Sequence, residues 1–143
     1  LDTLPLTDLI VKIKEIFEQV EPEIIYMPYA YDVHTDHQIT AKASQSNLKW
    51  FRNPYIQKVL MYETPSETEF NFSEKNVFKP NVFLNIADHL DVKIEAMQIY
   101  KSEIGDFPFP RSEKNMRSIA AFRCSQSGYE AAEAFELVFQ RRK

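Results

Sequence analysis

Amphipathic helical segments alternate with short apolar runs along this chain of 143 residues. In residues 7–20 apolar side chains recur on one helical face, which predicts a helix capped by Thr7 or Asp8 and ended by Pro22. Residues 24–27, Ile-Ile-Tyr-Met, form a run of strand-forming residues without polar alternation. We therefore expect a strand that is covered on both faces. This alternation favours an α/β fold, in which helices pack against a sheet.

The rest of the chain continues the same pattern. The further expected elements are a helix over residues 36–48 capped by Thr35 in T-x-x-Q spacing, strands over 58–62 and 82–86, a polar excursion over 64–79, a helix capped by Asp88, and a helix opened by Ser112. Gly128 marks a break, and residues 131–139 fit a last strand and a helix end equally well. This order of helices and strands again favours a sheet layer that is packed by helices.

Composition excludes several classes of protein. The 17 basic and 21 acidic residues give a formal charge of −4, which argues against nucleic acid as a partner. The two glycines are too few for a glycine-rich nucleotide loop or a G-x-S-x-G elbow. No apolar run approaches the length of a membrane span, and the first residues do not resemble a signal peptide. One cysteine, Cys124, excludes an internal disulfide and is compatible with the cytoplasmic location that we expect.

One cluster has the residue types of a catalytic or metal site. The hexapeptide D-V-H-T-D-H, residues 32–37, holds two of the three histidines and two carboxylates. It follows an expected strand, and α/β folds place their sites beyond the carboxyl ends of strands. A neutral imidazole such as that of His37 can bind a metal, His34 lies on the loop just before it, and the adjacent Asp36 can hold an imidazole N–H and so fix its tautomer.

The residues of this cluster, and three others, also have ordinary structural interpretations, and two surface histidines can be neighbours by chance. Asp36 can complement a helix dipole, and Asp32 can form a turn. His89 fits an exposed helix start, and Cys124 fits a small core position. Glu63 follows a strand and fits either the sheet edge of the histidines or a solvated position.

The motifs resemble a known family. Residues 28–37, P-Y-A-Y-D-V-H-T-D-H, are similar to the P…D-x-H-x-D-H segment of the LmbE-like family, also called the PIG-L family of zinc-dependent N-deacetylases. Three further segments resemble this family in the same order: F-K-P-N-V-F-L-N-I at 78–86, with Asn85 where Asp is usual, L-D-V-K at 90–93 followed by Ala96, and A-E-A-F-E at 132–136.

One departure limits what the resemblance implies. The H-P-D-D-E motif, which carries the family's other metal and base residues, is absent. The resemblance implies an α/β fold with a Rossmann-like three-layer arrangement of a sheet with helices. It also implies that residues 1–143 are the C-terminal two-thirds of a single deacetylase domain, here incomplete, without its N-terminal segment. The sequence begins at Leu1 rather than Met, which favours a fragment, but a split protein and a degenerate one stay open.

The resemblance also implies roles for individual residues. His37 matches the residue that binds Zn²⁺. His34 matches the residue that stabilises the oxyanion and protonates the leaving amine, and Asp36 matches the carboxylate that orients this histidine. The expected activity of the complete protein is hydrolysis of an N-acetyl group from an acetamido sugar, such as an N-acetylglucosamine conjugate. A homo-oligomer is common in the family, and the fragment alone is expected to be inactive and to bind zinc weakly.

Two other functions stay open from the residues. A metal-dependent phosphoesterase would use the same histidines and Asp36 with further bridging carboxylates. A binding or assembly module would keep the fold without the chemistry.

Overall fold

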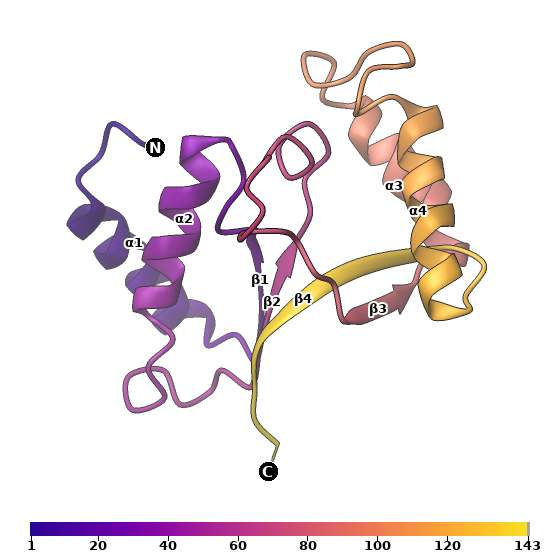
Figure 1. Ribbon diagram of the computed structural model, residues 1–143. Helices are drawn as coiled ribbons and strands as arrows, with labels where there is room; N and C mark the ends of the chain where they lie inside the picture. Colours follow the sequence, from indigo (N-terminus) through magenta and orange to yellow (C-terminus); the bar gives the residue numbers. More distant parts are fainter. Residues whose placement is uncertain (143) are drawn as a thin grey trace. The chain divides into compact units, whose positions relative to one another are not determined.

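The computed structural model describes residues 1–142 and contains one mixed sheet of four strands (Figure 1). The strands are β1 (Ile24–Pro28), β2 (Lys58–Tyr62), β3 (Val82–Asn85) and β4 (Ala132–Gln140), hydrogen-bonded in the order β1-β2-β4-β3. β1 pairs with β2 in parallel, and β2 pairs with β4 antiparallel. The expected α/β class is confirmed.

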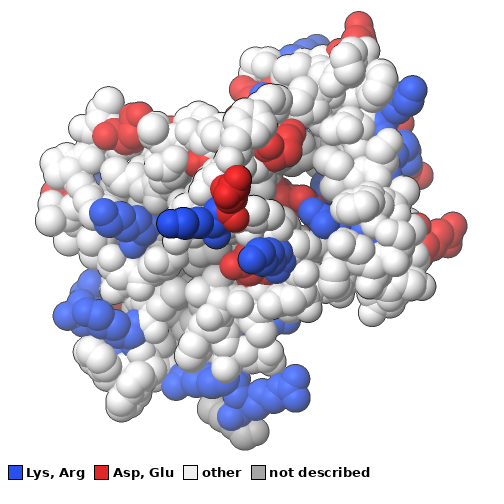
Figure 2. Space-filling model, in the orientation of Figure 1, with Lys and Arg blue, Asp and Glu red and all other residues white. Residues whose placement is uncertain are grey.

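Within residues 1–142, four α-helices and one short 3₁₀ helix accompany the sheet. They are α1 (Leu6–Val20), α2 (Thr35–Ser46), η1 (Ala87–His89), α3 (Leu90–Gln98) and α4 (Glu113–Ser127). None of the helices that the structure describes is long and apolar enough to cross a lipid bilayer. On the face shown in Figure 2, basic and acidic side chains are interspersed.

The first of two compact units comprises Leu1–Lys79 together with the end of the chain from Phe135. In this unit α1 and α2 lie side by side (Figure 1), and Phe17 of α1 packs against strand residues. Met27 and Val59, on the paired strands β1 and β2, are 1% and 0% exposed. This apolar core fixes the carboxyl end of β1 and the loop that follows it.

The second unit is Pro80–Ala134. Here α3 and α4 lie side by side (Figure 1), and the Arg117 guanidinium binds the Asp91 carboxylate at 2.8 Å. Ser112 caps α4 as expected, because its hydroxyl accepts from the backbone N–H of Asn115. Gly128 ends the same helix in a left-handed conformation with φ of 77°.

Three predicted helix caps were wrong. Pro5 precedes α1 and no side chain caps that helix, because Thr7 and Asp8 already lie in its first turn. Asp88 lies within η1 and does not cap α3.

The third wrong cap lies at the start of α2. His34, not Thr35, is the N-cap, and its Nδ1 accepts from the backbone N–H of Asp36. The T-x-x-Q box does not form, because the Gln38 amide donates instead to the Asp32 carbonyl at 2.6 Å.

The strands also differ from the prediction in two respects. β1 is not covered on both faces: the side chains of Ile24 and Tyr26 are 48% and 51% exposed. Pro28 is the last residue of β1, so the strand ends at the expected proline but includes it, which an edge strand tolerates. The undecided C-terminal segment is a strand, β4.

Candidate functional site

The structure brings His34 and His37 together where β1 leads into α2. A six-residue loop, 29–34, separates the strand from the helix, and His37 lies in the first helical turn. The two imidazole rings stack with their centroids 5.0 Å apart and their planes inclined by 20°. The stacking brings two imidazoles together just beyond the carboxyl end of β1, where α/β folds place their ligands.

A buried carboxylate holds His37. The Asp32 side chain is 0% exposed, and its Oδ2 lies 2.8 Å from His37 Nδ1. A carboxylate only accepts hydrogen bonds, so the proton of the neutral imidazole is on Nδ1 and the lone pair is on Nε2. The His37 ring keeps 25% exposure, and Nε2 therefore has the form of a metal ligand or a base.

Thr68 supports the same carboxylate from a distant part of the chain. Its hydroxyl donates to Asp32 Oδ1 at 2.6 Å. Burial raises the pKa of Asp32, while the hydrogen bonds from Thr68 and His37 act in the opposite direction. The two donors together allow a carboxylate to sit inside the unit as an anchor for the imidazole.

His34 has the opposite tautomer. The backbone N–H of Asp36 donates to His34 Nδ1 at 3.2 Å, so Nδ1 is an acceptor and the ring proton of the neutral form is on Nε2. The stacked rings therefore differ in chemistry, because His34 offers an N–H donor where His37 offers a lone pair.

Asp36 contacts His34 through its backbone. Its carboxylate Oδ1 instead accepts a hydrogen bond from the backbone N–H of Asp2 at 2.8 Å. In this structure the side chain of Asp36 therefore forms a hydrogen bond with neither imidazole.

Sequence reasoning missed the anchor. Asp32 is part of the candidate cluster in the sequence, with a turn as its alternative role, but it is not paired there with His37, to which its buried carboxylate is bonded. Its position five residues before His37 was the available signal. Nothing in the sequence indicated Thr68, which is 36 residues away from Asp32 in a polar segment.

Two further candidates lie elsewhere. His89 is exposed beside α3, and Cys124 is partly exposed on α4, both in the second unit. Among residues 1–142, no group of three or more His, Cys, Asp and Glu side chains is placed to hold a metal ion. The described residues therefore do not form a complete set of metal ligands by themselves.

Comparisons with known proteins bear on the fold. No family model matches the chain. The N,N'-diacetylchitobiose deacetylase from Pyrococcus horikoshii superposes with a TM-score of 0.67 at 20% identity, over 96% of this chain and 54% of that one. The 4-carboxy-2-hydroxymuconate hydratase GalB from Pseudomonas putida superposes with a TM-score of 0.67 at 18% identity, over 96% of this chain and 60% of that one. The zinc-inhibited form of teicoplanin deacetylase Orf2 superposes with a TM-score of 0.65 at 15% identity, over 96% of this chain and 53% of that one.

The chain shares their fold. The resemblance to LmbE-like deacetylases, which rested on short motifs, is confirmed at the level of the fold. The chain spans between 53% and 60% of the lengths of these three proteins. The likeness to a hydratase at the same TM-score shows that the fold by itself does not select the reaction.

Proposed function

We propose that the complete protein removes an N-acetyl group from an acetamido sugar or sugar conjugate by zinc-dependent hydrolysis. The observation that carries this proposal is the stacked pair of His34 and His37 with opposite tautomers, at the start of α2. Amide hydrolysis needs both a metal donor and a group that donates hydrogen bonds or protons. Two neighbours with the same fold are named deacetylases, which supports the choice of reaction.

The residues of this chain fit zinc at one position. His37 has a free Nε2 lone pair, and its Nδ1 is fixed by a buried carboxylate, as is typical of zinc-binding histidines. The other donors and the general base belong to a part of the domain outside residues 1–142. Bound zinc would polarise the amide carbonyl and acidify a water molecule.

His34 supplies the donor side of the reaction. In the neutral ring, the Nε2–H of His34 can donate a hydrogen bond to the oxyanion that develops on the substrate. Protonation of the leaving amine requires the imidazolium form, in which Nδ1 also carries a proton and needs an acceptor. Asp36 is our candidate for this acceptor, with its carboxylate replacing the backbone N–H that now contacts Nδ1.

We further propose that residues 1–143 are the C-terminal part of one such domain. The neighbours are longer than this chain, which spans 54% of the chitobiose deacetylase. β1 is an edge strand, so its free edge can pair with a further strand. Its residues Ile24 and Tyr26 are half exposed and could be covered by the same missing part. Under this proposal the remaining zinc ligands arrive with that strand.

Hydration is the second candidate, favoured by the equal TM-score of GalB. It would use the same Nε2–H of His34 as a proton donor and would release no acetate. The motifs around His34 favour deacetylation, because they resemble the deacetylase family over four segments of the chain.

The decisive activity test measures acetate and primary amine released by the complete protein from N-acetylglucosamine conjugates. We expect equal amounts of the two products, loss of both on chelation, and recovery when a stoichiometric amount of zinc is restored. An N-acetylated sugar phosphate serves as a control, because a phosphoesterase would release phosphate and leave the amide intact. Absence of acetate, with phosphate release or with hydration of an unsaturated acid, would overturn the proposal.

A further inference from the structure

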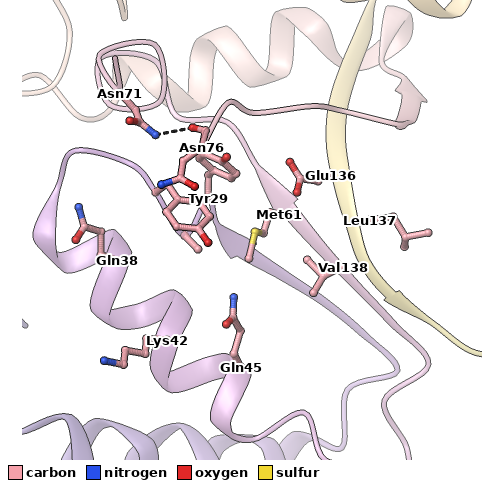
Figure 3. Close-up of a pocket in the computed structure, with 12 residues that line it drawn as sticks. Tyr29, Gln38, Lys42, Gln45, Met61, Asn71, Asn76, Glu136, Leu137 and Val138 are labelled. Atoms are coloured by element: carbon pink, nitrogen blue, oxygen red, sulfur yellow. Dashed lines mark hydrogen bonds between the residues drawn. The ribbon is translucent and has the colours of Figure 1, made fainter. Parts of the chain in front are cut away.

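A cavity of about 770 Å³ lies in the first unit, apart from the stacked imidazoles. Its walls come from the loop after β1, from α2, from β2 and β4, and from residues Asn71 and Asn76. In Figure 3, Gln45 rises from α2 toward Met61 of β2, with Tyr29 and Asn76 above them. Neither His34 nor His37 lines the cavity. The loop after β1 and α2, on which these two histidines lie, nevertheless supply part of its wall.

The polar lining consists mainly of carboxamides. Gln38 and Gln45 lie on one side of α2, and Asn76 faces them from the loop. Among the described residues, the side chains of Gln45 and Asn76 make no hydrogen bond. The side-chain amide of Asn71 donates to the backbone carbonyl of Asn76 at 2.7 Å. A carboxamide both donates and accepts, which matches the dual character of a hydroxyl group. Free carboxamides therefore favour a ligand rich in hydroxyl or amide groups.

The charges around the cavity balance. Lys42 contributes one cation and Glu136 one carboxylate, and Glu136 already accepts from the Lys79 backbone N–H at 3.1 Å. A phosphate or carboxylate ligand would require clustered cations, which the lining does not supply. An extended apolar ligand would leave the carboxamides without partners, at a cost in affinity. A neutral polar ligand needs no clustered cations and gives the carboxamides hydrogen-bonding partners.

Tyrosine rings add a flat, partly apolar surface. Tyr29 contacts Tyr31 edge to face with centroids 5.6 Å apart, and both line the cavity. Burial is the main cause that raises the pKa of Tyr29 to about 12, so its hydroxyl stays protonated at neutral pH. A ring with an apolar body and a hydroxyl handle suits the mixed surface of a sugar.

We infer that this cavity binds a neutral sugar ring, and that it holds the unit of an oligosaccharide or conjugate that is not deacetylated. The cavity and the imidazoles share one segment of the chain. Tyr29 and Tyr31 line the cavity, and they precede Asp32 in the loop that leads to the imidazoles. Gln38 links the two directly, since it lines the cavity and its amide donates to the Asp32 carbonyl. The identity of the sugar as part of the substrate rests on the proposed function; the presence of a neutral-sugar site does not.

The test is a titration of the full-length protein with N,N'-diacetylchitobiose, followed by NMR chemical shifts. We expect shifts at Gln45 and Asn76, and about fivefold weaker binding in Gln45→Leu, since one hydrogen-bonding group is lost. Gln19→Leu is the matched control, an exposed glutamine on α1 outside the cavity, and should bind as the unchanged protein does. Glucose 6-phosphate should bind more weakly than cellobiose, which carries no charge.

A double variant, His34→Ala with His37→Ala, separates this inference from the proposed function. Sugar binding at the cavity should persist in that variant. In the active protein, Gln45→Leu should raise KM and leave kcat unchanged. If acetate is released but Gln45→Leu alters neither binding nor KM, the cavity inference is wrong and the proposed function stands. If no acetate is released but the shifts at Gln45 persist, the sugar site stands and the proposed reaction fails.

Discussion

Replacement of His34 by alanine in the complete protein is expected to lower turnover about 10²–10⁴-fold while the metal stays bound. The Nδ1 of His34 is held as an acceptor by the Asp36 N–H, so Nε2 carries the hydrogen that can reach the substrate. Alanine removes this donor without removing the metal donor, which is on His37. The measurements are kcat with an N-acetylated sugar and the zinc content of the purified variant.

His37→Ala completes this comparison. It should lose zinc and turnover together, because the Nε2 lone pair that Asp32 orients disappears. His89→Ala, at an exposed position in the second unit, should change neither quantity. Equal loss of zinc from the His34 and His37 variants would show that the two rings do not have the different roles assigned to them.

Replacement of Asp32 by alanine should weaken zinc binding about 10–100-fold and lower the free energy of unfolding by about 3 kcal/mol. The carboxylate is fully buried and accepts from both His37 and Thr68. Its removal leaves the Thr68 hydroxyl unpaired and frees the His37 ring to change tautomer and orientation. Zinc titration and urea unfolding measure the two effects on the same preparation.

Two further variants separate the electrostatic effect from the loss of packing. Asp32→Asn keeps the volume, can accept from His37 and can donate to Thr68, so it should recover most of the stability. It should still bind zinc more weakly, because the negative charge behind the imidazole is gone. Asp88→Ala removes an exposed carboxylate and should change stability by less than about 0.5 kcal/mol. Zinc affinity that is unchanged in Asp32→Ala would exclude Asp32 as the anchor of a metal ligand.

The elements with strong local signals were predicted well from the sequence. The strand expected over 58–62 has those bounds in the structure, and α1 ends at Val20, before Pro22. Apolar periodicity and proline act within a few residues, so they can be interpreted without knowledge of the fold. The proximity of His34 and His37 was visible for the same reason, since they are three positions apart at one helix start.

Features that depend on tertiary structure were not predictable. The role of Asp32 requires Thr68, which reaches it only when the segment after β2 folds back. The half-exposed face of β1 depends on what the rest of the sheet covers, and a short apolar run does not encode it. The last strand was ambiguous for a related reason: it is defined by pairing with β2, whose residues precede it by more than 70 positions.

The most direct test of the site is anomalous diffraction from zinc-loaded crystals of the complete protein. The proposal predicts one zinc peak about 2.0–2.1 Å from His37 Nε2, with Nδ1 still bonded to Asp32 and with His34 outside the coordination sphere. A zinc peak coordinated by His34, or one remote from both imidazoles, would contradict the assignment of the two rings.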